Sequence, residues 1–289
     1  MDELDVQQQA RQFIAPLDTR NVRDDLSVYL KAANAILLKE ELGQGESGTT
    51  MTRGDGKHII TVNSLENEVR QRFTICHEIA HIVLRLPSRH NEVRQWSYAK
   101  RHINEIACDW FAAELLMPYR MWLDSVPDGE PSYEVIDEMA EKFQCSYPAA
   151  ASRYASLATF PCAFVTMEIG AVKYAARSAS LRRAKAWISP RSIIPAGSVA
   201  ERLRREGMSQ IGSGEVDQDV WFDEWESGLD LTEIARHYRS SDTTLSLLWF
   251  DEEVLPEREV DRFGRVVEEE EGLSELTGEL PWPGKRGRR

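Results

Sequence analysis

The chain has 289 residues, of which 42% are hydrophobic, and its formal net charge is −13. This length and composition allow a buried core and predict two or three domains. The negative charge argues against general binding to nucleic acid or to a membrane surface. No window approaches eighteen uninterrupted apolar residues, and the N-terminus is acidic where a signal peptide is basic. Four cysteines without a CxxC pair predict no disulfide framework. We therefore expect a cytoplasmic protein.

The first part of the chain predicts helices and a small sheet. Spaced apolar residues among charges indicate amphipathic helices at 2–15 and 22–34. A strand is expected at 35–42. Two further strands, at 49–53 and 57–63, flank a Gly-Asp-Gly turn and predict a hairpin. The second arm of the hairpin leads directly into a strongly apolar helix that a proline, Pro87, ends.

This apolar helix carries the motif H-E-x-x-H, formed by His77, Glu78 and His81. Residues i and i+4 of a helix leave the same face one turn apart, so the two imidazoles can converge on one ion. The carboxylate beside them can reach a water on that ion and act as general base. Polar side chains in an apolar helix are costly unless they are satisfied, which favours a metal site over two buried core histidines.

A catalytic zinc site needs a third protein ligand, and the next predicted helix, 103–117, offers one. Glu105 and Asp109 lie at i and i+4 on one face, so that Glu105 can bind the ion while Asp109 orients an imidazole. A carboxylate ligand with a carboxylate orienter suits this type of site, and we favour Glu105. His90, His102 and Glu114 remain alternatives from the sequence alone.

Two more helices follow, joined by a short turn, and they have the outline of a helix-turn-helix. The first is rich in acidic residues, and the second has Ser146 as a predicted N-cap and Arg153 as its one basic residue. Helices that read a DNA groove carry cationic and amide side chains. We therefore expect a structural or protein-docking role for this region and no specific DNA binding.

The remainder of the chain changes to strand-like runs, which predict a separate α+β domain. We expect strands at 163–169, 172–179, 220–223 and 243–250 and a helix at 199–205. The last residues, 256–289, turn acidic and then basic and are expected to be a disordered tail.

The sequence resembles the ImmA/IrrE metallopeptidases in three stretches: 71–74 (QRFT), 77–81 (HEIAH) and 105–118 (EIACDWFAAELLMP). The motifs cover roughly residues 57–118, and their combination is much more specific than H-E-x-x-H alone. A departure is Ala80, where IrrE proteins often have glycine. The resemblance implies a zinc site with Glu105 as third ligand, with Mn²⁺ as an alternative ion.

The resemblance also implies the fold and the activity. We expect an α+β protein, with a zincin-like metallopeptidase domain at 1–127, a helix-turn-helix-like region at 128–159 and a GAF-like α+β domain at 160–255. The expected function is that of a regulatory metallopeptidase that cleaves an Xre-type helix-turn-helix repressor and so releases stress-response or mobile-element genes. A non-catalytic metal-binding protein or a DNA-binding regulator is the alternative.

Substrate contacts are expected on strand 57–63, which as a sheet edge would align a peptide through Ile59, Ile60 and Thr61. An ordinary sheet edge explains this strand equally well. A donor to the oxyanion is expected among Tyr98, His102, Tyr147 and Tyr154, with Tyr154 also assigned to the substrate site. Cys76 and Cys108 adjoin the motif residues and are expected to be buried, inert thiols rather than redox sensors.

Overall fold

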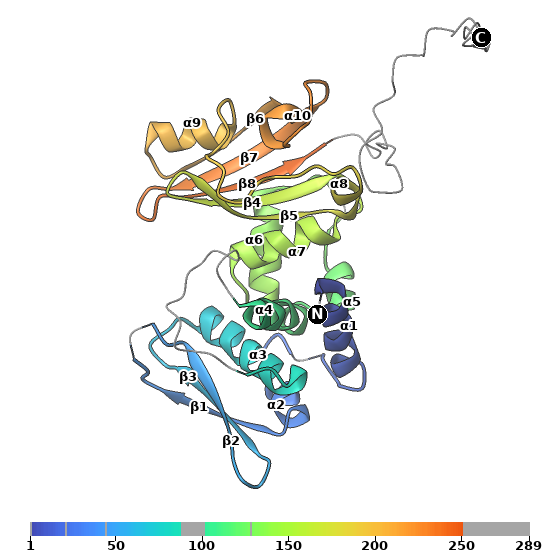
Figure 1. Ribbon diagram of the computed structural model, residues 1–289, viewed down its shortest axis with the longest axis vertical. Helices are drawn as coiled ribbons and strands as arrows, with labels where there is room; N and C mark the ends of the chain where they lie inside the picture. Colours follow the sequence, from blue (N-terminus) through green and yellow to red (C-terminus); the bar gives the residue numbers. More distant parts are fainter. Residues whose placement is uncertain (1, 21, 44, 88–101, 128, 251–289) are drawn as a thin grey trace, which may run out of the picture. The chain divides into compact units, whose positions relative to one another are not determined.

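The computed structural model describes residues 2–20, 22–43, 45–87, 102–127 and 129–250 (Figure 1). These described residues belong to one compact unit. The predicted tail at 256–289 lies outside the described residues. Within the described part, no helix is long and apolar enough to cross a membrane.

A three-stranded sheet supports the N-terminal half. Its order is β1 (Ala35–Glu40), β3 (His58–Asn63) and β2 (Gly48–Thr52), with β3 parallel to β1 and antiparallel to β2. The hairpin expected from the glycine turn is confirmed, and Gly56 adopts the left-handed φ of 81° that a tight turn requires. The expectation that 57–63 is a sheet edge is wrong, because β3 is the central strand.

Two longer helices follow, of which the first packs on β2 and β3 and the second packs on the first. Asn67 caps α3 (Glu68–Leu84) by accepting a hydrogen bond from the Arg70 amide, and the helix ends at Arg85 in the left-handed conformation. His102 caps α4 (Ile103–Leu116) in the same way. Both helices bury almost all of one side, which fixes their facing surfaces.

Short helices complete this half: α1 (Glu3–Ile14) packs on α4, α2 (Ser27–Ala32) precedes β1, and α5 (Tyr119–Leu123) follows α4. The expected N-terminal helices are confirmed, although the second is much shorter than 22–34.

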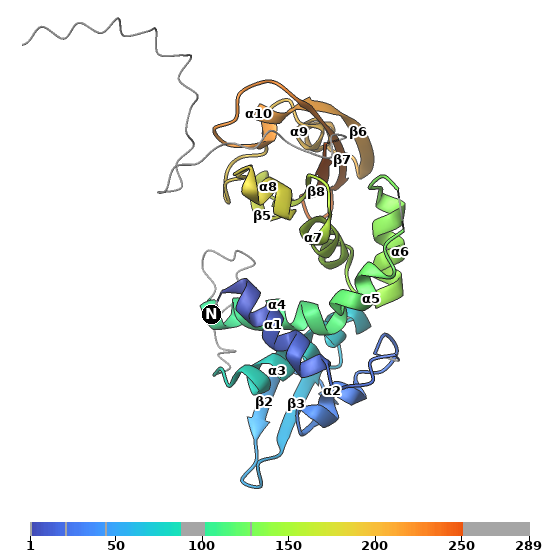
Figure 2. The ribbon, with the colours of Figure 1, turned by 90° about the vertical axis from the view of Figure 1, so that its right-hand side faces the viewer.

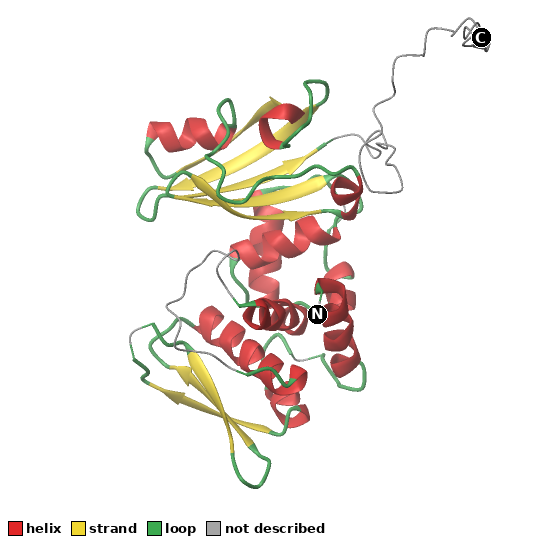
Figure 3. Cartoon of the chain, viewed as in Figure 1, coloured by secondary structure: helices red, strands yellow, loops and turns green. Residues whose placement is uncertain are grey.

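A helical pair and a second sheet form the other half of the unit (Figures 1 and 3). The pair is α6 (Tyr133–Phe143) and α7 (Tyr147–Leu157), with Ser146 capping α7 as expected. The sheet has the order β5-β4-β8-β7-β6, and every neighbouring pair is antiparallel. The bounds of these strands are β4 (Cys162–Glu168), β5 (Ala171–Arg177), β6 (Gln210–Asp217), β7 (Asp230–Tyr238) and β8 (Thr243–Trp249).

Helices cover both faces of the second sheet. Helix α7 packs on β4, β5 and β8, while α9 (Val199–Glu206) packs on β6, β7 and β8 from the other face. The short α8 (Ala179–Arg183) contacts β4. The predicted strand at 220–223 is wrong, because Gln218–Trp221 forms the helical turn α10. Only Asp223 makes an isolated bridge there, to Trp187.

Candidate metal centre

Helix α3 presents His77 and His81 on one face, as the spacing predicts. His77 Nε2 and His81 Nε2 lie 3.2 Å apart, and both residues are buried. Helix α4 brings Glu105 to the same point. Glu105 Oε2 is 3.1 Å from His77 Nε2, and Glu105 Oε1 is 3.5 Å from His81 Nε2. Two imidazole nitrogens and a carboxylate therefore converge from two helices.

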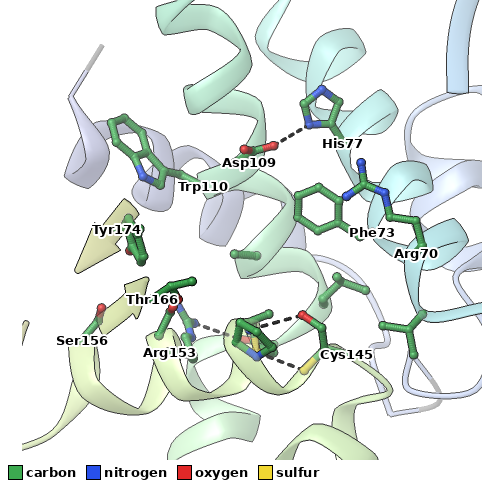
Figure 4. Close-up of a pocket in the computed structure, with 18 of the residues that line it drawn as sticks. Arg70, Phe73, His77, Asp109, Trp110, Cys145, Arg153, Ser156, Thr166 and Tyr174 are labelled. Atoms are coloured by element: carbon green, nitrogen blue, oxygen red, sulfur yellow. Dashed lines mark hydrogen bonds and ion pairs between the residues drawn. The ribbon is translucent and has the colours of Figure 1, made fainter. Parts of the chain in front are cut away.

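The other ring nitrogen of each histidine is held by an acceptor. His77 Nδ1 donates to Asp109 Oδ1 at 2.9 Å, a contact visible in Figure 4. His81 Nδ1 donates to the carbonyl oxygen of Leu86 at 3.2 Å. Since a carboxylate and a carbonyl can only accept, each Nδ1 carries a proton. In the neutral rings, each Nε2 atom then carries a lone pair, and both lone pairs face the point where the two rings and Glu105 converge.

These donors fit a divalent cation. Two Nε2 lone pairs and the Glu105 carboxylate face one another, and Glu105 Oε1 is buried without a hydrogen bond from the described residues. Three acceptors at such distances repel unless a positive charge lies between them. Their separations of 3.1 to 3.5 Å are also those of a tetrahedral zinc site, which places nitrogen and oxygen ligands about 3.4 Å apart. His77, His81 and Glu105 would hold such an ion.

The electrostatics of the chain without an ion lead to the same conclusion. Burial alone lowers the pKa of His77, but the hydrogen bonds that its ring makes to the Asp109 and Glu105 carboxylates, together with nearby carboxylate charges, raise it to about 9. Burial opposes ionisation of Glu105, yet the two histidines hold its pKa well below its usual range. A positive charge at this point is therefore stabilised by its surroundings, and a proton supplies it when no metal does.

Glu78 lies beside the two histidines and is also buried. The Thr50 hydroxyl, on strand β2, donates a hydrogen bond to Glu78 Oε2 at 2.8 Å. The strand can approach so closely because residue 48 is glycine. A Cβ at Gly48 would overlap Thr74 Cγ2 and lie 3.6 Å from Glu78 Cγ. Strand β2 thus holds the carboxylate of the motif in place.

A cavity of about 1660 Å³ opens on this group and is lined by His77, Glu78, Glu105 and Asp109. It continues along α3 and α4 past Phe73 and Trp110, and its far wall includes Tyr174 on β5 (Figure 4). The site is therefore accessible to a ligand much larger than water. Figure 2 gives a second view of the elements that surround it.

A cysteine also adjoins the histidines. Ligand atoms of His77, His81 and Cys108 all lie within 4.8 Å of one another, and all three residues are buried. The Glu105 oxygens approach both Nε2 atoms more closely than this limit. We therefore take Glu105 as the third donor that faces the cavity and Cys108 as a donor behind it, because Cys108 does not line the cavity.

Two of the three alternative ligands lie within the described residues. His102 lines the cavity, but its Nδ1 accepts the Asn104 amide as the helix cap. Glu114 is fully buried and binds Arg11 and Arg153 instead. His90 lies outside the described residues, as does Tyr98.

The structure separates the expected substrate residues from the cavity. Tyr154 is 5% exposed and packs edge-on against Phe160, so its assignment to the substrate site is wrong. Tyr147 stacks on Tyr133 in the core. Ile60 is fully buried in the central strand, and Ile59 and Thr61 pair with β1 and β2 on either side. The sheet edge beside the metal helix belongs to β2.

One contributing residue was missed in the sequence. Thr50 lies 28 positions before Glu78, in a hairpin arm that carries no motif. An alternation of threonines in a strand is ordinary, so only the tertiary contact reveals its role.

Comparisons with known proteins agree with this geometry. Residues 33–154 match the family model of the IrrE N-terminal-like domain, a peptidase family. Among solved structures, the chain is similar to one described as a Mycobacterium tuberculosis transcriptional regulator. The TM-score is 0.56 at 14% identity, over 85% of this chain and 76% of that chain. At this identity the likeness concerns the fold alone. None of the curated proteins matches the chain.

Proposed function

We propose, from the IrrE N-terminal-like domain that this chain carries over residues 33–154, that the protein is a metal-dependent regulatory endopeptidase. Its proposed substrate is a helix-turn-helix repressor of the Xre type. The observation that carries the proposal is the convergence of His77 Nε2, His81 Nε2 and the Glu105 carboxylate at 3.1 to 3.5 Å. This donor set leaves one tetrahedral position for a reactant, which is the arrangement of catalytic rather than structural zinc sites.

The chemistry would be peptide hydrolysis. A bound divalent ion supplies Lewis acidity that polarises the scissile carbonyl and acidifies water. Glu78 would accept the proton of the attacking water and deliver it to the leaving amine. Thr50 holds Glu78 for this purpose by its hydrogen bond of 2.8 Å. Asp109 holds the His77 ring through Nδ1, so that Nε2 is presented to the ion.

The edge of β2 suits an extended substrate. Asn63 N donates to Ser47 O, and Arg53 N donates to Lys57 O. Since the direction of backbone groups alternates along an antiparallel pair, Gly48 and Thr50 direct their backbone groups away from β3. A peptide strand could add to this edge directly beside Glu78. This replaces the substrate role that the sequence assigned to β3.

The DNA-binding alternative is disfavoured by the position of α7. The second helix of a helix-turn-helix has to enter the major groove. Here α7 packs on β4, β5 and β8, and its basic residue, Arg153, is buried in an ion pair with Glu114. The regulatory role would therefore be exerted through proteolysis.

The test is co-expression with an Xre-type repressor encoded beside the protein's gene, followed by gel electrophoresis and mass spectrometry. The wild type should cut the repressor at one exposed linker. Glu78→Gln should abolish cutting while repressor binding stays measurable, because the metal donors and docking surfaces remain. Casein should be cut poorly, because the proposal makes substrate choice depend on docking contacts beyond the catalytic residues, which casein lacks.

Two outcomes would contradict the proposal. Repressor loss that continues with Glu78→Gln would exclude Glu78 as the general base. A sequence-selective footprint on DNA at physiological salt, without repressor cleavage, would favour the DNA-binding alternative instead.

A further inference from the structure

We infer that the metal centre contains a second donor set, in which the Cys108 thiolate joins His77 and His81 to hold a thiophilic ion such as Cd²⁺. The inference starts from the arrangement on α4. Glu105 and Cys108 are three residues apart, so they lie on the same face of the helix, one turn from each other. Glu105 lies beside a ring nitrogen of each histidine of α3, and the Cys108 sulfur is close to both rings.

The two donors differ in depth. Glu105 lines the cavity, whereas Cys108 is fully buried and does not line it. The ligand atoms of His77, His81 and Cys108 lie within 4.8 Å of one another. A tetrahedral site with zinc-like bond lengths separates a thiolate sulfur from an imidazole nitrogen by about 3.6 Å. The limit exceeds this separation by about 1 Å, so a side-chain shift of at most about 1 Å brings the sulfur into bonding distance.

The two donors also differ in chemistry. A carboxylate oxygen suits hard ions such as Mn²⁺, while a thiolate favours soft ions. On binding, the thiol proton passes to solvent and the sulfur lone pair forms the new bond to the ion. An ion bound to both histidines, Cys108 and Glu105 would have four protein ligands and no open position, as in structural sites. Thiophilic ions should therefore be retained in an inactive form.

The experiment titrates the purified full-length apoprotein with Cd²⁺ and, separately, with Mn²⁺. Ultraviolet absorption reports the thiolate-to-cadmium charge transfer, and ¹¹³Cd NMR reports whether sulfur is bound. The wild type should show one sulfur ligand with Cd²⁺. Glu105→Ala should lose Mn²⁺ binding yet keep Cd²⁺. The double variant Glu105→Ala/Cys108→Ala should bind neither ion well. Its affinity for Cd²⁺ should fall more than about tenfold below that of Glu105→Ala.

Cys76→Ala is the matched control. Cys76 is equally buried and adjoins His77 on α3, but it is not among the three clustered donors. It should retain the sulfur signal. Cys108→Ser, with circular dichroism to verify the helices, provides a second variant in case the alanine perturbs the core.

The inference is overturned if the ¹¹³Cd spectrum of the wild type shows no sulfur ligand, or if Cys76→Ala removes the signal and Cys108→Ser retains it. The inference shares the two histidines with the proposed function but does not depend on peptidase activity. A wild type that cuts the repressor without a sulfur signal refutes only the second donor set. A wild type with the signal but no cutting refutes only the peptidase.

Discussion

The Thr50 hydroxyl donates a hydrogen bond of 2.8 Å to Glu78 Oε2, which connects the edge strand of the first sheet to the carboxylate of the H-E-x-x-H motif. The bond holds Glu78 Oε2 against strand β2. Thr50 is therefore a positioning residue, and its contribution can be separated from that of the metal donors.

Thr50→Val should lower kcat about tenfold, because a hydrogen bond to a charged group contributes about 1.5 kcal/mol or more. KM and metal content should change little, since valine preserves the volume and touches no metal donor. Thr50→Ser, which keeps the hydroxyl, should restore most of kcat. Equal losses for valine and serine, measured by repressor cleavage kinetics, would point to a packing role instead.

Glu105→Ala should reduce bound Mn²⁺ or Zn²⁺ sharply, whereas Glu78→Gln should retain about one ion per chain. The reason is that Glu105 lies 3.1 Å from His77 Nε2 and Glu78 is held by Thr50 instead. Metal content after dialysis can be measured by mass spectrometry. His102→Ala is the control, because His102 caps α4 through Nδ1. Full metal in Glu105→Ala together with loss in His102→Ala would reassign the third ligand.

Gly48→Ala should lower repressor cleavage and also reduce stability by about 1–3 kcal/mol, because it overpacks a buried contact. The added methyl would overlap Thr74 Cγ2 and push β2 away from α3, which lengthens the bond from Thr50 to Glu78. The matched test is Gly48→Ala/Thr74→Ser, because serine lacks the Cγ2 methyl. Cleavage in the double variant should recover. A double variant as slow as Gly48→Ala would show that the steric explanation is incorrect.

Arg153→Met should destabilise the fold by about 3 kcal/mol, measured from urea midpoints. Glu114 is fully buried, and Arg153 Nη2 lies 2.8 Å from Glu114 Oε2. Removing one partner leaves a buried carboxylate with less compensation. The double variant Arg153→Met/Glu114→Leu should recover much of the loss. Arg205→Met, which breaks the exposed pair with Glu201, should cost less than about 0.5 kcal/mol.

The buried His237 ring should make the free energy of unfolding depend on pH. The residue is 3% exposed and its Nδ1 lies 2.9 Å from Thr244 Oγ1. Burial lowers the pKa of His237 below its ordinary value. The Arg204 charge lowers this pKa further, and the nearby Asp242 charge partly opposes the shift. The unfolded chain therefore binds a proton at a higher pH than the folded chain does. The stability from the neutral ring is present above about pH 6.5 and is lost as the pH falls below it.

His237→Gln should flatten the dependence of the urea midpoint between about pH 7.5 and about pH 5.5. His58→Gln, in the first sheet, is the control and should leave the slope of the wild type. An unchanged slope in His237→Gln would show that other groups carry the pH dependence.

The sequence predicts the elements whose pattern is local. The metal helix, its partner helix, the hairpin and the cap at Ser146 were all found, because apolar periodicity and turn residues act over a few positions. The donor arrangement of His77 and His81 also follows from helical spacing. The contact of Thr50 with Glu78 could not be found in this way, since it depends on how a strand packs on a helix.

The strands β6 and β7 were missed for physical reasons that the structure explains. Strand β6 contains Gly212 and Gly214, which weaken a strand pattern, but a Cβ at either would crowd side chains of α9. Strand β7 has polar residues, Glu233 and His237, on its buried face. Glu233 accepts hydrogen bonds from the first amides of α9. A buried carboxylate that caps a helix of the opposite layer cannot be recognised by alternation of hydrophobicity.

The end of α3 connects the metal centre to local unfolding of the chain. Arg85 adopts φ 54°, and the turn places Leu86 so that its amide bonds to the carbonyl of His81 while its carbonyl accepts the His81 ring proton. Leu86 thus closes the helix through its amide and fixes the His81 ring through its carbonyl. Unwinding of the last turn would release the imidazole, and an ion held by Nε2 would oppose the unwinding by mass action. Metal affinity and hydrogen-exchange protection of this turn are therefore two measures of one equilibrium.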